Sequence, residues 1–261
     1  MKINKLSNFA LKIIGMLTMV IDHVGYFLFP HILVLRIIGR ISFPIFAFLC
    51  AESMHYSSNK FRYITTLLSL DIIISLVIYL ATGVNHGTVF SCLGLSALII
   101  YLLQNKNNWI KALSILPIAY VIIASLKFTP VTMQYSLYGV ILIIGFYFIR
   151  VILSYFQKQA FGLDENNNTF NFKFYHALSC SLFLLTICLL TFNFSDFFNT
   201  YLSKGNMDYS IQSNAFLACP FILLYSGTKG YSKNWFKPFS YLFYPGPVLI
   251  ILLIQIIMQM I

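Results

Sequence analysis

Hydrophobic residues are gathered in long stretches that alternate with short polar segments. A helix needs about 17–25 mostly apolar residues to cross the hydrocarbon core of a bilayer. Nine stretches approach this length, at 9–29, 33–53, 62–81, 88–104, 109–126, 135–156, 175–193, 211–226 and 238–260. Two of them, 88–104 and 211–226, are short enough to be half-membrane or broken helices. The pattern predicts an all-α, polytopic membrane helical bundle of about eight to ten transmembrane helices.

Two polar segments divide this bundle. Residues 158–173 form an inner connection between helices 1–6 (9–156) and helices 7–9 (175–260), and residues 193–210 form the one sizeable outer segment. Because both fall between apolar stretches of one continuous pattern, we treat residues 1–261 as a single integral membrane domain.

Basic residues fall mostly in alternate connections. With a cytoplasmic N-terminus, thirteen Lys and Arg residues, Arg150 among them, lie in inner segments, and only Lys127 and Lys204 lie in outer segments. Cytoplasmic loops carry such an excess of Lys and Arg in multi-pass proteins. We therefore expect a bacterial inner-membrane protein with its N-terminus in the cytoplasm.

Composition supports a lipid bilayer as the surroundings. The chain is 59% hydrophobic and 9% charged, whereas a soluble domain carries about 25% charged residues. Basic loops explain the net charge of +10, and no basic stripe with stacking aromatic residues indicates a nucleic-acid partner. The five cysteines are scattered singly through apolar segments, so we expect buried thiols and no metal site.

Ionisable residues inside apolar stretches are concentrated in the first two. These are Asp22, His23, Arg36, Arg40, Glu52 and His55. An Arg or Asp at the centre of a membrane helix costs roughly 3 kcal/mol, so these side chains should face one another, protein or water. On antiparallel helices with a rise of about 1.5 Å per residue, Asp22, His23 and Arg40 reach one level. Pro44 is expected to kink the second helix.

This group suits acyl transfer. Removal from water favours the neutral imidazole, which can act as a general base, and Asp22 either fixes the tautomer of His23 or pairs with an arginine. Arginines bind phosphate or carboxylate, and Lys60 and Arg62 lie at the inner mouth. A structural Asp22–Arg40 ion pair is the alternative. Asp71, alone in the third stretch, is either a packing group or an accessory proton site.

Several blocks carry a family resemblance. They are LKIIGMLTMVIDHVG (11–25), LRIIGRISFPIFAFLCAESMHYSSN (35–59), YSLYGVILII (135–144), FILLYSGTKG (221–230) and FYP (243–245). In this order they resemble the TraX family, whose founding member acetylates the N-terminus of conjugative pilin. The resemblance implies a transmembrane acyltransferase-like fold that moves an acetyl group from cytoplasmic acetyl-CoA to a peptide N-terminus or a cell-surface glycan.

The resemblance also implies roles for individual residues. His23, in the DH motif, would be the general base with Asp22 beside it. The substrate would be bound by Arg36 and Arg40 of the RxxGR motif together with Glu52 and His55, and acetyl-CoA by Lys60 and Arg62. Gly246 and Pro247 stand where the family pattern continues to a histidine. A proton- or anion-coupled transporter, or a non-catalytic assembly factor of the same fold, are the competing hypotheses.

Overall fold

The described part of the chain is helical. The computed structural model describes residues 5–82, 87–126, 133–161, 172–202, 208–231, 233, 235–247, 250, 251 and 254. In this part there is no β-strand, only one isolated parallel bridge between Leu6 and Tyr225. The elements are α1 (Asn8–Phe27), α2 (Leu33–Gly39), α3 (Ser42–Tyr56), α4 (Lys60–Thr82), α5 (Val89–Leu103), α6 (Asn108–Ala112), α7 (Ile115–Ser125), α8 (Ser136–Phe161), α9 (Phe172–Asn193), α10 (Ser195–Tyr201), α11 (Tyr209–Gln212), the 3₁₀ helix η1 (Ser213–Ala218), α12 (Cys219–Leu223) and α13 (Phe236–Leu242).

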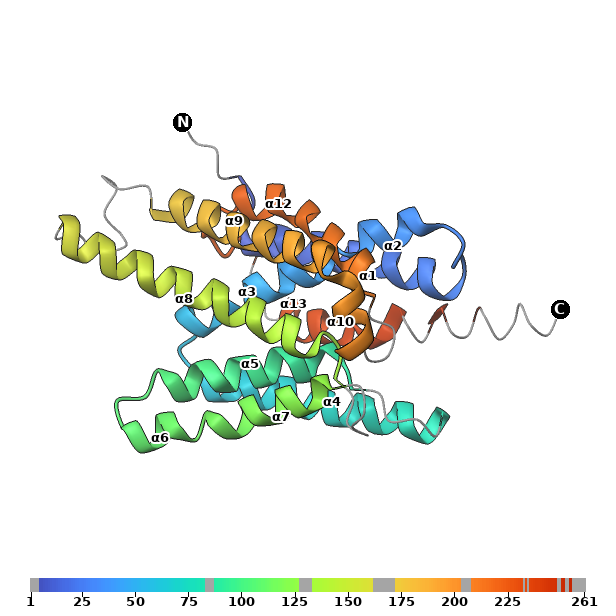
Figure 1. Cartoon of the computed structure of the whole chain (residues 1–261), viewed down its shortest axis with the longest axis horizontal. Helices are drawn as coiled ribbons and strands as arrows, with labels where there is room; N and C mark the ends of the chain where they lie inside the picture. Colours follow the sequence, from blue (N-terminus) through green and yellow to red (C-terminus); the bar gives the residue numbers. More distant parts are fainter. Residues whose placement is uncertain are drawn as a thin grey trace. The chain divides into compact units, whose positions relative to one another are not determined.

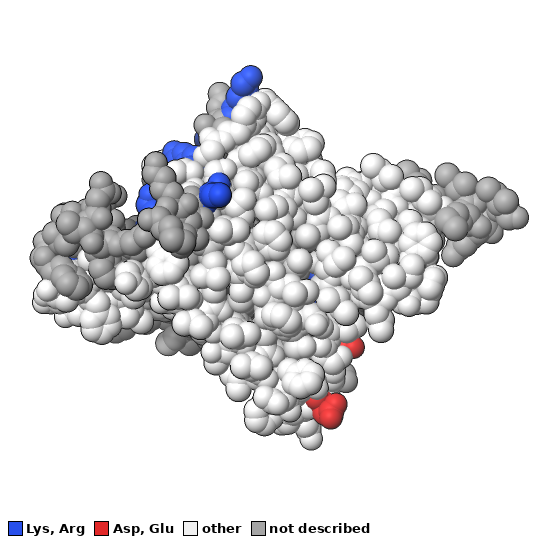
Figure 2. Space-filling model, turned by 90° about the horizontal axis from the view of Figure 1, so that it is seen from above, with Lys and Arg blue, Asp and Glu red and all other residues white. Residues whose placement is uncertain are grey.

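Within the described residues, six helical segments are long and apolar enough to cross a membrane. They are Asn8–Phe27, Leu33–Tyr56, Lys60–Leu80, Asn108–Ser125, Ser136–Ala160 and Phe172–Asn193, and Val89–Leu103 is a shorter apolar helix. The face shown in Figure 2 is almost entirely uncharged, as a lipid-facing surface requires. These features confirm a multi-pass helical membrane protein.

Two expected segments differ in detail. The stretch 211–226 is not one helix, because η1 separates α11 from α12. The outer segment 193–210, expected as a loop, contains α10. Part of the expected last span, 238–260, and most of the inner connection, 158–173, lie outside the described residues.

The chain forms two compact units. The first contains residues 1–46, 152–189 and 211–261, and the second contains residues 47–151 and 190–210. Four of the five cysteines are buried and Cys219 is half-buried, which confirms their expected place in the apolar interior.

In the first unit, α1 packs against α2 at small residues. A Cβ on Gly25 would lie 2.6 Å from the Cβ of Leu35, so only a glycine permits this approach. Ser7 caps α1 by accepting a hydrogen bond from the amide of Ala10 at 3.2 Å. The preceding residue, Leu6, exchanges backbone hydrogen bonds of 2.8 Å with Leu224 and Ser226. Backbone hydrogen bonds to the residues after α12 therefore fix the segment that precedes α1.

In the second unit, α5 packs against α4, α6 and α7 (Figure 1). Gly94 of α5 faces Leu68 of α4, where a Cβ would lie 2.7 Å from a Leu68 methyl carbon. Asp71 joins the same two helices, because its Oδ1 accepts hydrogen bonds from the backbone N–H (3.2 Å) and the hydroxyl (2.7 Å) of Thr88, the N-cap of α5. The described contacts of Asp71 favour the packing role.

The second apolar stretch is interrupted four residues before Pro44. The helix breaks at Arg40 and Ile41, and Pro44 lies in the first turn of α3. A proline has no N–H to bond the carbonyl of the residue four positions earlier, and its ring crowds that carbonyl. The expected kink is therefore present, displaced from Pro44 to Arg40, whose amide bonds the carbonyls of Arg36 and Ile37.

Candidate functional site

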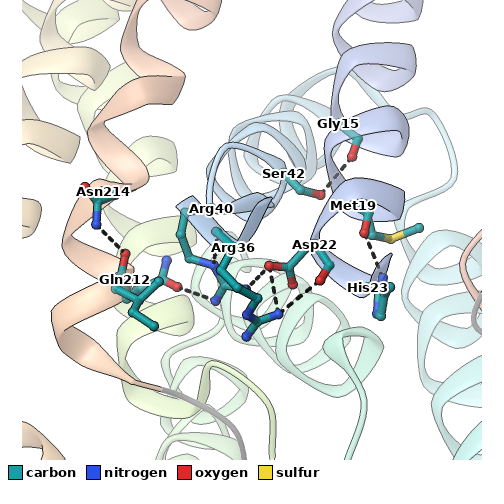
Figure 3. A network of polar contacts seen from close by, with 10 residues as sticks. Gly15, Met19, Asp22, His23, Arg36, Arg40, Ser42, Gln212 and Asn214 are labelled. Carbon is teal, nitrogen blue, oxygen red and sulfur yellow. Dashed lines mark hydrogen bonds and ion pairs between the residues drawn. The ribbon is translucent and has the colours of Figure 1, made fainter. Parts of the chain in front are cut away.

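Asp22 of α1 lies between two arginines. Its Oδ1 is 2.9 Å from Nη1 of Arg36 and 2.5 Å from Nη2 of Arg40 (Figure 3). Arg36 Nη1 also donates to the backbone carbonyl of Asp22 at 3.3 Å, and the guanidinium of Arg36 lies 4.9 Å from the ring centroid of Tyr26. The expected pairing of Asp22 with an arginine is confirmed, and it involves both arginines.

Gly39 makes this arrangement sterically possible. It is the last residue of α2, directly before Arg40, and a Cβ at this position would meet the Asp22 side chain. The glycine of the RxxGR motif thus gives the Asp22 carboxylate the space in which both guanidinium groups reach it. The helix break after Gly39 then lets Arg40 point back toward α1.

Arg40 has a second partner that the sequence did not indicate. Its Nη1 donates to Oε1 of Gln212 at 3.1 Å, and its Nε donates to the backbone carbonyl of Arg36 at 3.3 Å. Arg40 is 4% exposed and Gln212 is fully buried. The only signal for Gln212 was a polar residue in a short apolar stretch, and no pattern connects it with a residue 172 positions earlier.

His23 points away from the two arginines (Figure 3). Its Nδ1 lies 2.8 Å from the backbone carbonyl of Met19, one helical turn earlier. Since a carbonyl only accepts, the neutral ring carries its proton on Nδ1 and has its lone pair on Nε2. No residue in the described part of the chain forms a hydrogen bond with Nε2.

This geometry decides between the two roles considered for Asp22. Adjacent helical residues point about 100° apart, and the described hydrogen bond that sets the tautomer of His23 is donated to the carbonyl of Met19 rather than to Asp22. The rings of Phe27 and Tyr244 flank the imidazole, with centroids at 6.3 and 6.2 Å. Tyr244 belongs to the FYP block, so that block lies at the histidine.

A second polar cluster lies in the second unit, around Glu52. Its Oε1 is 2.7 Å from Nη1 of Arg150, and both side chains are buried, at 3% and 4% exposure. Arg150 Nη2 donates to the hydroxyl of Tyr56 at 2.5 Å. Arg150, counted above with the inner residues, lies within α8, which continues to Phe161. A buried cation needs a partner, and Glu52 is that partner.

The expected contacts for acetyl-CoA lie in the same unit. Lys60, the first residue of α4, donates to Oε1 of Gln104 at 2.5 Å, and the amide of Gln104 donates to the hydroxyl of Tyr147 at 2.9 Å. Arg62 is exposed, and His55 is half-buried with its ring edge-on to that of Tyr56. Lys60 is therefore held by a neutral partner, and Arg62 is accessible.

The described residues contain no group of three or more His, Cys, Asp or Glu side chains that could hold a metal ion. The Arg and Lys side chains described above could hold the phosphates of a nucleotide cofactor, because guanidinium and ammonium groups donate charge-assisted hydrogen bonds to phosphate oxygens.

Comparison with known proteins decides the family. A family model described as "TraX protein" matches residues 7–161. The chain belongs to the TraX family. The match includes His23, the RxxGR motif, Glu52 and Arg150, and it ends where α8 ends.

The TraX chain also resembles a protein of Rickettsia prowazekii (strain Madrid E), "Uncharacterized protein RP591". The two are 41% identical over 54 residues, a segment that spans 21% of this chain and 21% of the relative. No solved structure matches this TraX protein.

Proposed function

We propose that this TraX-family protein is a membrane-embedded acetyltransferase that moves an acetyl group from cytoplasmic acetyl-CoA to an amine or hydroxyl of a peptide N-terminus or a cell-surface glycan. The observation that carries the proposal is the state of His23. A hydrogen bond to Met19 places the proton on Nδ1, so Nε2 is the basic atom of a ring set in an apolar helix.

In the proposed reaction, Nε2 of His23 removes the proton of the acceptor amine or hydroxyl. The acceptor atom attacks the thioester carbonyl and the carbon–sulfur bond breaks. The CoA thiolate then receives the proton from the imidazolium. The histidine ends as it began, and the acetyl group is on the acceptor. The acceptor proton ends on the thiol of CoA.

The other expected residues have binding roles in this proposal. Arg36 and Arg40 converge on Asp22, whereas the His23 ring lies at the Met19 carbonyl (Figure 3), so we assign the two arginines to an anionic group of a substrate rather than to the reacting atoms. Lys60 and exposed Arg62 are the proposed contacts for the phosphates of acetyl-CoA. Glu52, which pairs with Arg150, and His55 are proposed to line the substrate path. With a cytoplasmic N-terminus, the inner ends of the helices, where Lys60 and Arg62 are expected, face the compartment that holds acetyl-CoA.

The test is consumption of acetyl-CoA by purified protein in lipid nanodiscs, with transfer followed by radiolabelled acetyl groups. His23→Gln should lower the rate at least about 100-fold, the scale of general-base catalysis. His31→Gln is the matched control, because His31 is exposed in the connection between α1 and α2, and it should retain the rate. Equal rates for wild type and His23→Gln would overturn the proposal.

A further inference from the structure

A second polar region of the first unit lies where α1 and α9 begin. The residues after α12 reach both helix starts: Tyr225 forms its bridge with Leu6, two residues before α1, and Lys173 is the second residue of α9. α12 is fixed to α9, because the hydroxyl of Ser181 donates to the carbonyl of Cys219 and the thiol of Cys219 donates to the carbonyl of Ser181, both at 3.4 Å. Three segments far apart in the sequence therefore meet at one end of this unit.

The connection after α12 is held by its backbone. Gly227 and Gly230 turn the chain with φ angles of +68°, a conformation that favours glycine. The carbonyls of Thr228 and Lys229 accept hydrogen bonds from the first two amides of α1, at 2.8 and 3.2 Å. The backbone of Lys229 is thus fixed while its side chain stays exposed.

Lys173 of α9 lies along the same connection. A Cβ at Gly227 would be 3.0 Å from Cδ and Cε and 3.4 Å from Nζ of Lys173, so the glycine leaves the space that this side chain fills. Lys5, directly before Leu6, and Lys233 are also exposed here. We call Lys5, Lys173, Lys229 and Lys233 the lysine group.

The positive charge of the lysine group is not balanced nearby. Within the described residues, no carboxylate forms an ion pair with any of its four members. Asp22 is the one acidic residue in the described part of this unit. It lies about 20 Å further along α1, at a rise of about 1.5 Å per residue, and it contacts Arg36 and Arg40 instead.

Exposed aromatic rings adjoin the lysine group. The rings of Tyr231, Trp235 and Phe239 are exposed and follow one another, with centroids 6.2 and 5.5 Å apart. Tyr231 lies 5.2 Å from the ring of Phe9 at the start of α1 and 5.9 Å from Nζ of Lys233. Trp and Tyr are enriched at the level of the lipid headgroups, where one end of the side chain is in apolar surroundings and the other in water.

The depth of this region also matches the headgroups. The membrane-crossing segments Asn8–Phe27 and Phe172–Asn193 both begin here, so the lysine group lies where the apolar spans end. Ammonium groups form charge-assisted hydrogen bonds with phosphate oxygens, and basic residues beside a span attract anionic lipids. The phosphodiester of such a lipid is the anion that this depth supplies.

We propose that the lysine group, with the rings of Tyr231 and Trp235, is a binding site for the headgroup of an anionic phospholipid. The ammonium groups contact the lipid phosphate, and the exposed rings lie against the glycerol and the first methylenes of the acyl chains. The site goes beyond the proposed acetyltransferase and does not depend on it.

Trp235 can report on its own lipid neighbours. It is one of two tryptophans in the chain, so Trp109→Phe leaves it as the single indole. The full chain with this change is placed in phosphatidylcholine nanodiscs that contain a small fraction of brominated lipid, either phosphatidylglycerol or phosphatidylcholine. Because bromine quenches an adjacent indole, the quenching of Trp235 measures which lipid occupies the site.

We expect the site to prefer phosphatidylglycerol on the order of 5- to 30-fold, since each lysine near an anionic lipid contributes about 5-fold. The preference should fall toward 1 in about 1 M salt, which screens exposed charges. Lys173→Gln together with Lys229→Gln should lower it at least about 5-fold. Lys106→Gln together with Lys111→Gln is the matched control, because it removes the same charge from the second unit, and it should keep the preference.

Equal quenching by the two brominated lipids, or a preference that survives Lys173→Gln with Lys229→Gln, overturns the inference. The source of the phosphate is tested in nanodiscs of phosphatidylcholine alone. Stabilisation by CoA that is lost in the same double variant would assign the lysines to a soluble nucleotide and overturn the lipid site. A protein that prefers phosphatidylglycerol but never consumes acetyl-CoA would instead overturn the proposed acetyltransferase and leave the lipid site standing.

Discussion

Asp22 and His23 are adjacent in the chain and have different partners. The carboxylate of Asp22 holds two arginines, and the imidazole of His23 bonds a backbone carbonyl on its own helix. Helical geometry turns neighbouring side chains about 100° apart, so a sequence motif such as DH does not imply contact between its two members. The proposed base, His23, and the carboxylate that holds the two arginines therefore lie on one helix and have separate surroundings.

At the residue scale, the Glu52–Arg150 pair should stabilise the second unit only while both members are present. Arg150→Met leaves a buried carboxylate without its counter-ion and should cost about 3–5 kcal/mol of unfolding free energy. Glu52→Gln should cost a similar amount. The double variant Glu52→Gln, Arg150→Met should recover most of the loss, because no buried charge is then uncompensated.

The measurement is a double-mutant cycle of denaturant or thermal unfolding in detergent micelles. Exposed Arg62, replaced by Met, is the control and should change stability by less than about 0.5 kcal/mol. Additive losses in the double variant would show that the two side chains do not stabilise each other.

At the element scale, the break between α2 and α3 and the glycines of α1 and α2 place the site. Pro44 interrupts the helix at Arg40, and Gly25 and Gly39 let α1 and α2 approach closely. The break was predictable from a proline in an apolar stretch. Its position follows from the missing N–H, which affects the carbonyl four residues earlier.

Gly39→Ala should separate α1 from α2, since its methyl group would meet the side chain of Asp22. We expect a loss of about 1–3 kcal/mol of stability from overpacking. Gly246→Ala is the matched control, because a Cβ there meets nothing within 4 Å. Thermal unfolding in detergent measures the loss, and a Gly39→Ala protein as stable as the wild type would contradict the close contact between Gly39 and Asp22.

At the scale of the whole molecule, the six long apolar helical segments found among the described residues make the chain a multi-pass membrane protein. The alternation of basic residues predicts which connections face the cytoplasm. Four of the cysteines are buried and Cys219 is half-buried. Replacing Cys219 by serine therefore gives a background in which introduced cysteines can be labelled.

In that background, Lys106→Cys should react with a membrane-impermeant maleimide only after the cells are permeabilised, and Asp196→Cys should react in intact cells. Lys106 lies between α5 and α6 and Asp196 in the first turn of α10, in segments predicted to face opposite sides. Labelling of Lys106→Cys in intact cells would refute the predicted topology.

The order of apolar stretches and their family motifs determined the class of this protein, because a helix in lipid must satisfy its backbone internally and show an apolar surface. The sequence alone also located the acidic residue, the histidine and the two arginines of the first helices. Tertiary structure decided the partners: Gln212 for Arg40 and Arg150 for Glu52. Those pairs join residues 172 and 98 positions apart, and hydropathy records only whether a residue avoids water, not which distant side chain makes its burial tolerable.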